Sequence, residues 1–468
     1  MLQRIARALT AWSTRWVPDA YVIAVLLTVL AFGLALACTD AGPLDLVHAW
    51  GGGFWELLPF GMQMCLIIVT GYVLAVSPPM ERALGWLAGR ARSPRGAVVM
   101  TALLSLGLAW IHWGLSIVGS AVFVRRVARR QPRADYRLLV CCAYLGLGTL
   151  WHAGLSASMP LLVATPGHFM EPELGIIPVT RTLFHPLNLG LVFATVTILT
   201  ALAARLQPAG GVDPLVDWER VPEDGAGASS MPTGGVNAAA GEGAEARPAP
   251  GAEPAAGRSP AQWLEQSRAV NLLVGGAGLT WLVGWFGAKG LQGINLNTVN
   301  FAFLMLGVLL HGRPARLLAA AEQGGRYVWG VILQFPFYAG IFGIIKESKL
   351  QDVIAGWFTS VAHAHSYPLF VLWYSGVLNY VIPSGGSKWA IEAPYVVKAA
   401  HDVGANMDLT VLAYAWGDML TDIIQPFWAI PLLSIARLSF RDIMGYGVLF
   451  FLVYAVIVTA GFALVAFA

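Results

Sequence analysis

The chain has 468 residues, of which 57% are hydrophobic and only 12% are charged, and its formal net charge is +3. Because about a quarter of the residues of a typical soluble domain are charged, this composition excludes an ordinary soluble protein and predicts an all-α integral membrane protein surrounded by lipid. No basic stripe or arginine-rich helix indicates a nucleic-acid partner.

Residues 1–16 carry apolar residues at helical spacing with three arginines among them, which predicts an amphipathic helix at the membrane interface. The apolar runs that follow are long enough for helices across about 30 Å of hydrocarbon. We expect these spans near residues 21–38, 55–76, 137–166, 187–204, 269–288, 297–311, 327–345, 408–436 and 445–467. Threading them from a cytoplasmic N-terminus places the basic loops inside the cell.

Residues 96–124 form an apolar run with arginines directly before and after it. Since arginines favour the cytoplasmic side, both ends should lie in the cytoplasm, and the run is predicted to be a re-entrant hairpin. The alternative is one long tilted helix. We expect the chain to turn at Gly114, with His112, Ser116 and Ser120 as polar groups of the turn. An ionisable group inside the membrane is a functional candidate, although a lone histidine is often only structural.

The run at 137–166 contains the sequence GLSASMP, from Gly154 to Pro160. Glycine and proline weaken a helix, so we expect an interruption here. Backbone carbonyls freed by the break, around Ser156 and Ser158, could coordinate a cation.

Residues 205–268 are rich in Gly, Ala, Pro and Glu and have no periodicity. This composition is typical of a disordered linker, and the threading places it in the cytoplasm. The linker separates a first half at 17–204 from a connecting helix at 269–296 and a second half at 297–468.

The span expected at 327–345 carries Gln334 and Pro336 near its start. A polar amide beside a helix-breaking proline is expected to line a substrate cavity. Gln63 is its counterpart in the first half.

The sequence NYVIPSGGSKWAIEAP at 379–394 breaks the next apolar region, 367–400, whose two ends are expected outside the cell. Pro383 lacks a backbone donor and the glycines take positive φ readily, so one helix should stop near Ser384 and another start after Gly386. The free N–H groups of the second helix would attract a small anion. The alternative, an external loop between two spans, needs a longer run.

The same stretch carries two charged residues, Lys388 and Glu392. Lys388 is expected either to add positive charge to the turn or to extend along the helix toward water. Glu392 lies four residues later and is expected to pair with it.

The run at 408–436 carries Asp418 and Asp422 at helical i,i+4 spacing, followed by Gln425 and Pro426. Because a carboxylate is costly inside a bilayer, both should face a polar cavity, where one could carry a coupled proton. The alternative for Asp418 is a solvated position at the outer membrane interface.

The order span, hairpin, broken span occurs in both halves, and the charge pattern orients the two hairpins oppositely. This predicts two inverted repeats, each with a re-entrant hairpin and a broken helix. Secondary transporters have this layout, with the binding site near the middle of the membrane.

The segments FGMQMCLIIVTGY, SASMPLLVATPGH, QFPFYAGI, VIPSGGSKWAIEAP and QPFWAIP occur here in this order. They make the chain resemble the short-chain fatty acid transporter family, carriers of acetoacetate and butyrate, over nearly its whole length. The resemblance implies an ion-coupled, elevator-type carrier, a homodimer, in the plasma membrane (the bacterial inner membrane). It assigns the second hairpin tip to Ser384, Gly385, Gly386 and Ser387, and the first to His112, Trp113, Gly114 and Ser116.

We therefore expect a symporter that moves a short-chain carboxylate, such as butyrate or acetoacetate, with H+ or Na+ as coupling ion and no other cofactor. The expected ion-coupling residues are Asp418, Asp422 and His112. The expected substrate site holds the two tips with Gln334, Gln425, Ser156 and Ser158, and an apolar wall of Phe335, Phe337, Trp389 and Phe427. The alternatives are a membrane-embedded enzyme acting on acyl substrates, using His112, His152 and Asp422, and a passive carboxylate channel.

Overall fold

The computed structural model describes residues 20–213, 259–382 and 384–467. These residues form helices and connecting loops, with no β-strand among them. The helix expected at 1–16 and most of the linker expected at 205–268 lie outside the described residues, as does Pro383.

Seven of the described helices are long and apolar enough to cross a membrane, and an eighth span results if the bent pair at 407–436 is counted as one. The chain is therefore a multi-pass membrane protein. The seven helices are α2 (Ala20–Cys38), α4 (Leu58–Ala75), α6 (Pro94–Ile111), α11 (Pro186–Leu206), α13 (Arg268–Lys289), α16 (Trp329–Glu347) and α22 (Phe440–Phe467). All lie close to apolar runs found in the sequence.

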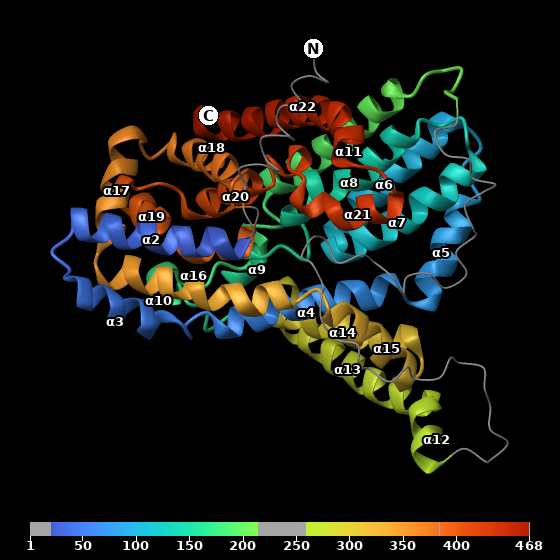
Figure 1. Cartoon of the computed structure of the whole chain (residues 1–468), viewed down its shortest axis with the longest axis horizontal. Helices are drawn as coiled ribbons and strands as arrows, with labels where there is room; N and C mark the ends of the chain where they lie inside the picture. Colours follow the sequence, from blue (N-terminus) through green and yellow to red (C-terminus); the bar gives the residue numbers. More distant parts are fainter. Residues whose placement is uncertain (1–19, 214–258, 383, 468) are drawn as a thin grey trace.

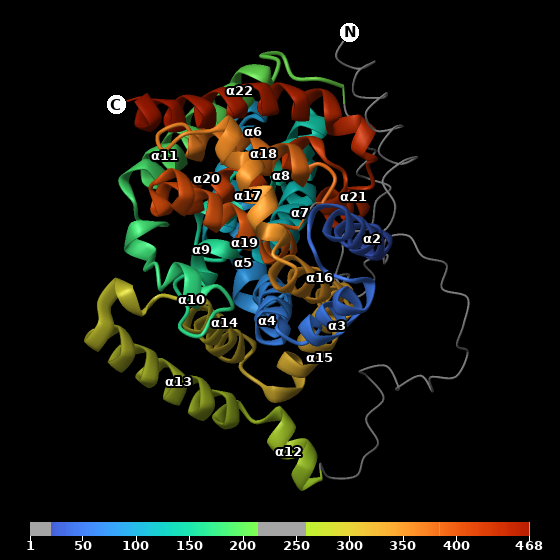
Figure 2. The same cartoon turned by 90° about the vertical axis from the view of Figure 1, so that its left-hand side faces the viewer.

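Shorter helices connect these spans. They are α3 (Pro43–Gly53), α5 (Pro78–Ala88), α10 (Glu171–Leu174), α12 (Pro260–Gln266), α14 (Leu296–His311), α15 (Pro314–Gly325) and α17 (Leu350–Val361), with 3₁₀ turns η2 (Val179–Arg181) and η3 (Gly290–Gly293). Several begin with proline, which suits the first helical position because its missing N–H has no partner there. Figure 2 shows α13 along one edge of the molecule, where it packs on α14.

The two halves of the chain interlock through their connecting helices. Helix α3 of the first half packs on α16 of the second, and α15 of the second half packs on α4 of the first. Close approach is possible because small residues meet: a Cβ at Gly53 would lie 2.7 Å from the Ala339 carbonyl oxygen, and one at Gly324 would lie 3.3 Å from that of Val69.

Each half contains a pair of helices joined by a sharp turn. In the first pair, α6 is followed by α7 (Trp113–Arg130), and the two pack against each other. The turn is at His112, which has extended backbone with φ −159°, and not at Gly114 as predicted, since Gly114 lies within α7. In the second pair, α18 (Tyr367–Asn379) is followed by α19 (Gly385–Val403). Helix α19 begins just before the predicted position, directly after Ser384.

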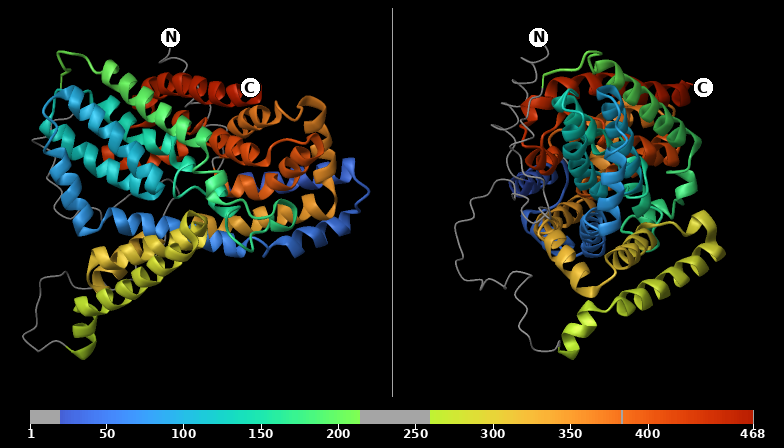
Figure 3. Two further views of the ribbon diagram at one scale, coloured as in Figure 1. Left: turned by 180° about the vertical axis from the view of Figure 1, so that it is seen from behind. Right: turned by 90° about the vertical axis from the view of Figure 1, so that its right-hand side faces the viewer.

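Each half also contains a broken span. The first consists of α8 (Tyr136–Thr149), η1 (Trp151–Ala153) and α9 (Met159–Leu162), so the predicted break at 154–160 is present. The second consists of α20 (Met407–Asp418), η4 (Asp422–Ile424), η5 (Phe427–Ala429) and α21 (Ile430–Ala436), and it bends by 67°. In Figures 1 and 3 the group α6–α8 and the group α18–α20 lie on opposite sides of the molecule and face each other near its centre.

The same packing motif joins hairpin to broken span in both halves. The Ser105 hydroxyl on α6 donates to the Ala143 carbonyl on α8 at 2.8 Å, and the Ser375 hydroxyl on α18 donates to the Tyr414 carbonyl on α20 at 3.1 Å. Three residues after each of these carbonyls stands a glycine, at 146 and 417, where a Cβ would overlap backbone of the neighbouring helix. These contacts hold each turn beside a break in the adjacent span.

Candidate functional site

A cavity of about 310 Å³ lies between the two hairpin turns. Trp113 and Gly114 line it from the first turn, and Ser384 and Ser387 from the second. Gln334 of α16 adds a polar amide. A smaller cavity of about 60 Å³ lies beside Ser158, Gly385 and Gly386 and shares Trp113 and Ser384 with the larger one. The structure thus brings together both predicted tips, although they are about 270 residues apart in the sequence.

The apolar lining of the larger cavity includes Phe335 and Phe427, as predicted. The other two aromatic residues expected there do not line it. Trp389 is fully buried and packs edge-on against Tyr414, with ring centroids 4.8 Å apart. Phe337 points to the other side of α16, where its ring lies 5.4 Å from that of Phe54.

The first turn is held by its own polar groups. The His112 ring is buried, and its Nδ1 accepts a hydrogen bond from the Gly114 amide at 3.1 Å, which caps the start of α7. The Ser116 hydroxyl donates to the Ser105 carbonyl at 2.9 Å, and the Ser156 hydroxyl accepts from the Trp113 amide at 2.9 Å. His112, Ser116 and Ser156 therefore fix the shape of the turn, and the cavity is lined by their neighbours.

The second turn presents the N-terminus of α19 to the cavity. Ser384 has extended backbone and precedes the first helical residue, and its hydroxyl donates to the Ser387 hydroxyl at 2.9 Å. The Ser384 side chain makes no capping hydrogen bond to the first N–H groups of this helix. Since such groups and the helix dipole favour negative charge, this helix start is suited to a carboxylate.

Gly385 allows the turn to approach the broken spans closely. A Cβ at this position would overlap the Asp418 carboxylate and would lie 2.7 Å from Cε1 of His152. A Cβ at Gly386 would lie 3.0 Å from Cζ of the Phe60 ring. Side chains at either glycine would push the turn away from its neighbours.

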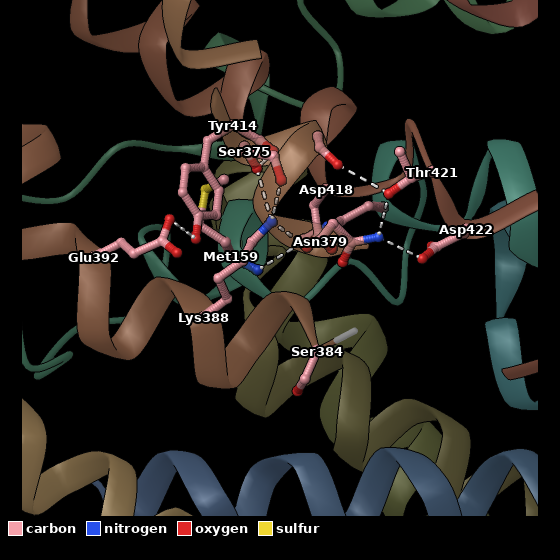
Figure 4. A network of polar contacts seen from close by, with 12 residues as sticks. Met159, Ser375, Asn379, Ser384, Lys388, Glu392, Tyr414, Asp418, Thr421 and Asp422 are labelled. Carbon is pink, nitrogen blue, oxygen red and sulfur yellow. Dashed lines mark hydrogen bonds and ion pairs between the residues drawn. The ribbon is translucent and has the colours of Figure 1, made fainter. Parts of the chain in front are cut away.

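Lys388 is completely buried and forms an ion pair with Asp418, with Nζ 2.9 Å from Oδ1 (Figure 4). Its ammonium also donates to the Ser375 carbonyl at 2.7 Å and to the Ser375 hydroxyl at 2.9 Å. The predictions that it pairs with Glu392 or extends toward water are wrong. Glu392 instead accepts a hydrogen bond from the Tyr414 hydroxyl at 2.8 Å. Helix α20 packs on α19 and supplies the partners of both residues, Asp418 for Lys388 and Tyr414 for Glu392.

The second oxygen of Asp418 contacts His152 of the first broken span, with Oδ2 3.0 Å from Nδ1. The other ring nitrogen, Nε2, accepts a hydrogen bond from the Met159 amide at 3.2 Å, and the Ser158 hydroxyl lies 2.8 Å from it. The ring proton of a neutral His152 is therefore on Nδ1, which donates to Asp418. The alternative position of Asp418 at a solvated interface is wrong, since its side chain is 1% exposed.

Asp422 is also buried but reaches different partners. Its Oδ1 accepts from the Asn379 amide at 2.7 Å, and its Oδ2 accepts from the Trp151 indole at 3.0 Å. The two aspartates do not share one helix face as predicted, because α20 ends at Asp418 and Asp422 begins a separate 3₁₀ turn. Each aspartate therefore contacts the second helix pair, through Lys388 or Asn379. Each also contacts the broken span of the first half, through His152 or Trp151.

The two remaining predicted glutamines lie away from the larger cavity. The side chain of Gln425 is buried, and its Oε1 has no hydrogen-bond partner within the part of the chain that the structure describes. Gln63 donates to Asn297 of α14 at 2.6 Å. Neither lines the cavity that Gln334 lines.

The sequence did not indicate that Ser375 and Asn379 would be polar groups of this site, nor that His152 would have a structural role in it. The sequence pattern around these residues is weak evidence, because a single serine, asparagine or histidine in an apolar helix does not show which residue it will contact. Among residues 20–213, 259–382 and 384–467, no group of three or more His, Cys, Asp or Glu side chains could hold a metal ion.

The sequence was compared with known families, curated proteins and solved structures. The family model described as "Short chain fatty acid transporter" matches residues 1–465. Relatives from Escherichia coli K12 and Haemophilus influenzae, each named "Putative short-chain fatty acid transporter", are 38% identical over 464 residues and 36% identical over 453 residues. The matches cover 99% of this chain and 100% of the first relative, and 95% of this chain and 96% of the second.

A solved structure, the YdaH transporter of Alcanivorax borkumensis, superposes with a TM-score of 0.58 at 17% sequence identity. The superposition covers 95% of this chain and 98% of that one, which shows a common fold. The family and the curated relatives are named as transporters and not as enzymes.

Proposed function

Because the chain belongs to the short-chain fatty acid transporter family, we propose that it is a symporter that carries a short-chain monocarboxylate, such as butyrate or acetoacetate, across the plasma membrane with H+ or Na+. Family membership confirms the resemblance inferred from the sequence. The observation that best supports the proposed site is the cavity between the two hairpin turns, which is lined by residues of both halves and sets the polar groups of Gln334, Ser384 and Ser387 beside an apolar wall.

The carboxylate group would bind at the start of α19, where the Ser384 and Ser387 hydroxyls and free backbone N–H groups converge. One helix end contributes up to about 2 kcal/mol to a charge in a partly buried position, so several donors are needed. The Gln334 amide, which also lines the cavity, is a further donor. The hydrocarbon tail would lie against Phe335 and Phe427.

The matched hydrogen bonds from Ser105 of α6 to α8 and from Ser375 of α18 to α20 support the proposal that the halves are repeats, and the charge pattern of the sequence is the reason to propose that they are inverted. In this arrangement each turn enters the membrane from one side and returns, and substrate binds where the turns meet. The elevator movement, the homodimer and the cytoplasmic N-terminus that the sequence suggested are parts of the same proposal.

Uptake into proteoliposomes tests the proposed function. Purified protein is reconstituted, and entry of labelled butyrate is followed under an imposed proton gradient, an imposed sodium gradient, or neither. Symport predicts accumulation above equilibrium with one of the gradients. Equilibration without accumulation would indicate a channel, and chemical conversion of the butyrate would indicate an enzyme.

Phe427→Ala is expected to shift the substrate preference toward longer acids, because it removes part of the apolar wall of the cavity. Hexanoate has two more methylene groups than butyrate, and each contributes about 0.8 kcal/mol when buried, so hexanoate uptake relative to butyrate should rise by roughly fourfold for one buried methylene to roughly 15-fold for both. Competition between the two acids in proteoliposomes measures this ratio. Phe337→Ala, on the other side of α16, is the matched control and should leave the ratio unchanged.

Asp422→Asn is expected to flatten the pH dependence of uptake if Asp422 carries the coupled proton. Asparagine keeps the size of the side chain beside Asn379 and Trp151 but cannot exchange a proton in this pH range. Initial uptake rates between pH 5 and pH 8 provide the measurement, with the surface variant Asp402→Asn as control. An unchanged pH profile would remove Asp422 from the coupling mechanism.

A further inference from the structure

The surroundings of the Lys388 ammonium are those of a bound cation. Its three oxygen neighbours are a backbone carbonyl, a hydroxyl and a carboxylate: Ser375 O at 2.7 Å, Ser375 Oγ at 2.9 Å and Asp418 Oδ1 at 2.9 Å. Two of the three N–H donors of the ammonium form hydrogen bonds with Ser375, and Asp418 Oδ1 contacts it as an ion pair. Hard cations such as Na+ are bound by this same mixture of oxygens, often at helix ends in transporters.

The helices around the ammonium are also oriented for a cation. Asp418 is the last residue of α20, and Ser375 lies among the last five residues of α18. C-terminal helix ends carry partial negative charge, which stabilises a cation. Lys388 itself lies in the first turn of α19, where the dipole disfavours positive charge. The oxygens of α18 and α20 therefore determine where the ammonium sits.

Other charged or titratable groups near the ammonium have partners of their own. His152 contacts the second oxygen of Asp418, Glu392 accepts from Tyr414, and Asp422 accepts from Asn379 and Trp151. The Tyr414 ring lies 5.1 Å from the ammonium. Within the described ranges, Asp418 is the one carboxylate that pairs with Lys388. Removing the ammonium would leave a buried negative charge that a small cation could neutralise.

The corresponding place in the first half has no charge. There the Ser105 carbonyl accepts a hydrogen bond from the neutral Ser116 hydroxyl, and the residue after Gly146 is Leu147, where the second half has Asp418 after Gly417. The chain thus has one such position, in its second half, within the residues described.

We propose that the Lys388 ammonium occupies a monovalent-cation position formed by Ser375 and Asp418, so that the chain supplies a tethered cation there in place of Na+. The consequence for transport rests on the proposed function: because the ammonium already occupies the cation position, substrate uptake requires no sodium. Replacing Lys388 by a small neutral residue should convert the position into a sodium site.

Thermal unfolding of purified protein tests the cation position without relying on transport. The midpoint of Lys388→Ala is measured in sodium chloride and in choline chloride at equal ionic strength. We expect sodium at 100 times its dissociation constant to raise the midpoint by roughly 3–5 °C. Wild-type protein and Lys398→Ala, which alters a partly exposed lysine of the same helix, should show no sodium-specific shift.

Lys388→Ala/Asp418→Asn should also lose the sodium-specific shift, because the carboxylate ligand is gone. The inference is overturned if Lys388→Ala shows no shift specific to sodium, lithium or potassium, or if the double variant keeps that shift. A Lys388→Ala protein that cannot be folded in any of these salts would equally contradict it, since the added cation should replace the lost charge.

Uptake provides the second readout. Wild-type uptake of butyrate should be the same within about twofold in sodium and in choline, whereas Lys388→Ala should need sodium, with a difference of roughly tenfold or more. A sodium requirement in the wild type would overturn the inference. Absence of butyrate uptake under every gradient would instead reject the proposed function, and the unfolding experiment would still decide the cation position.

Discussion

Gly385→Leu is expected to abolish butyrate uptake, with a loss of roughly 100-fold or more, the scale found when binding groups are displaced by about 1 Å. A side chain at this position would overlap the Asp418 carboxylate and approach Cε1 of His152 to 2.7 Å. The second turn would then have to move away from the broken spans, and with it the Ser384 and Ser387 hydroxyls that line the cavity. Initial uptake rates, normalised to the protein incorporated in the liposomes, measure the effect.

Gly356→Leu is the matched control for this substitution. Gly356 lies on α17, where a Cβ would meet no heavy atom within 4 Å, so uptake should remain close to that of the wild type. Size-exclusion profiles of both variants in detergent show whether they are folded. Near-normal uptake by folded Gly385→Leu would refute a substrate site at this turn.

Lys388→Met is expected to destabilise the protein by about 3–5 kcal/mol, the usual effect of removing one partner of a buried ion pair. Both side chains are buried, at 0% and 1% exposure, so the remaining Asp418 charge would be poorly solvated. Lys388→Met/Asp418→Asn should recover most of the loss, because replacing both partners by neutral groups of similar size is often close to neutral. Denaturant or thermal unfolding in choline chloride measures the three proteins.

The double variant decides how this result is interpreted. If Lys388→Met/Asp418→Asn is as unstable as Lys388→Met alone, the lost stability comes from packing of the lysine stem and not from an unpaired charge. That outcome would contradict the electrostatic role given to the pair.

Local features of the sequence predicted the breaks in the helices well. The PSGG segment placed the second turn within a few residues of where α18 ends and α19 begins. The arginines on both sides of 96–124 indicated a pair of helices, and α6 and α7 do pack against each other as such a pair. Glycine, proline and charge act on the backbone next to them, so their effects can be read from neighbouring residues alone.

Long-range partners could not be predicted in the same way. The i,i+4 rule gave Glu392 as the partner of Lys388, but α20 brings Asp418 to it from 30 residues away because Gly417 lets α20 approach α18 closely. The sequence also did not show which side of each membrane helix faces the cavity. Since such helices are apolar all round, their pattern did not show that Phe335 faces the cavity and Phe337 faces away from it.

The most direct test of the carboxylate site is a structure of the protein bound to 4-bromobutyrate, in which bromine marks the end of the hydrocarbon tail. We expect the carboxylate beside Ser384 and Ser387 and the bromine against Phe335 and Phe427, inside the 310 Å³ cavity. A molecule bound elsewhere, with that cavity free of it at saturating concentration, would contradict the placement of the substrate between the two turns.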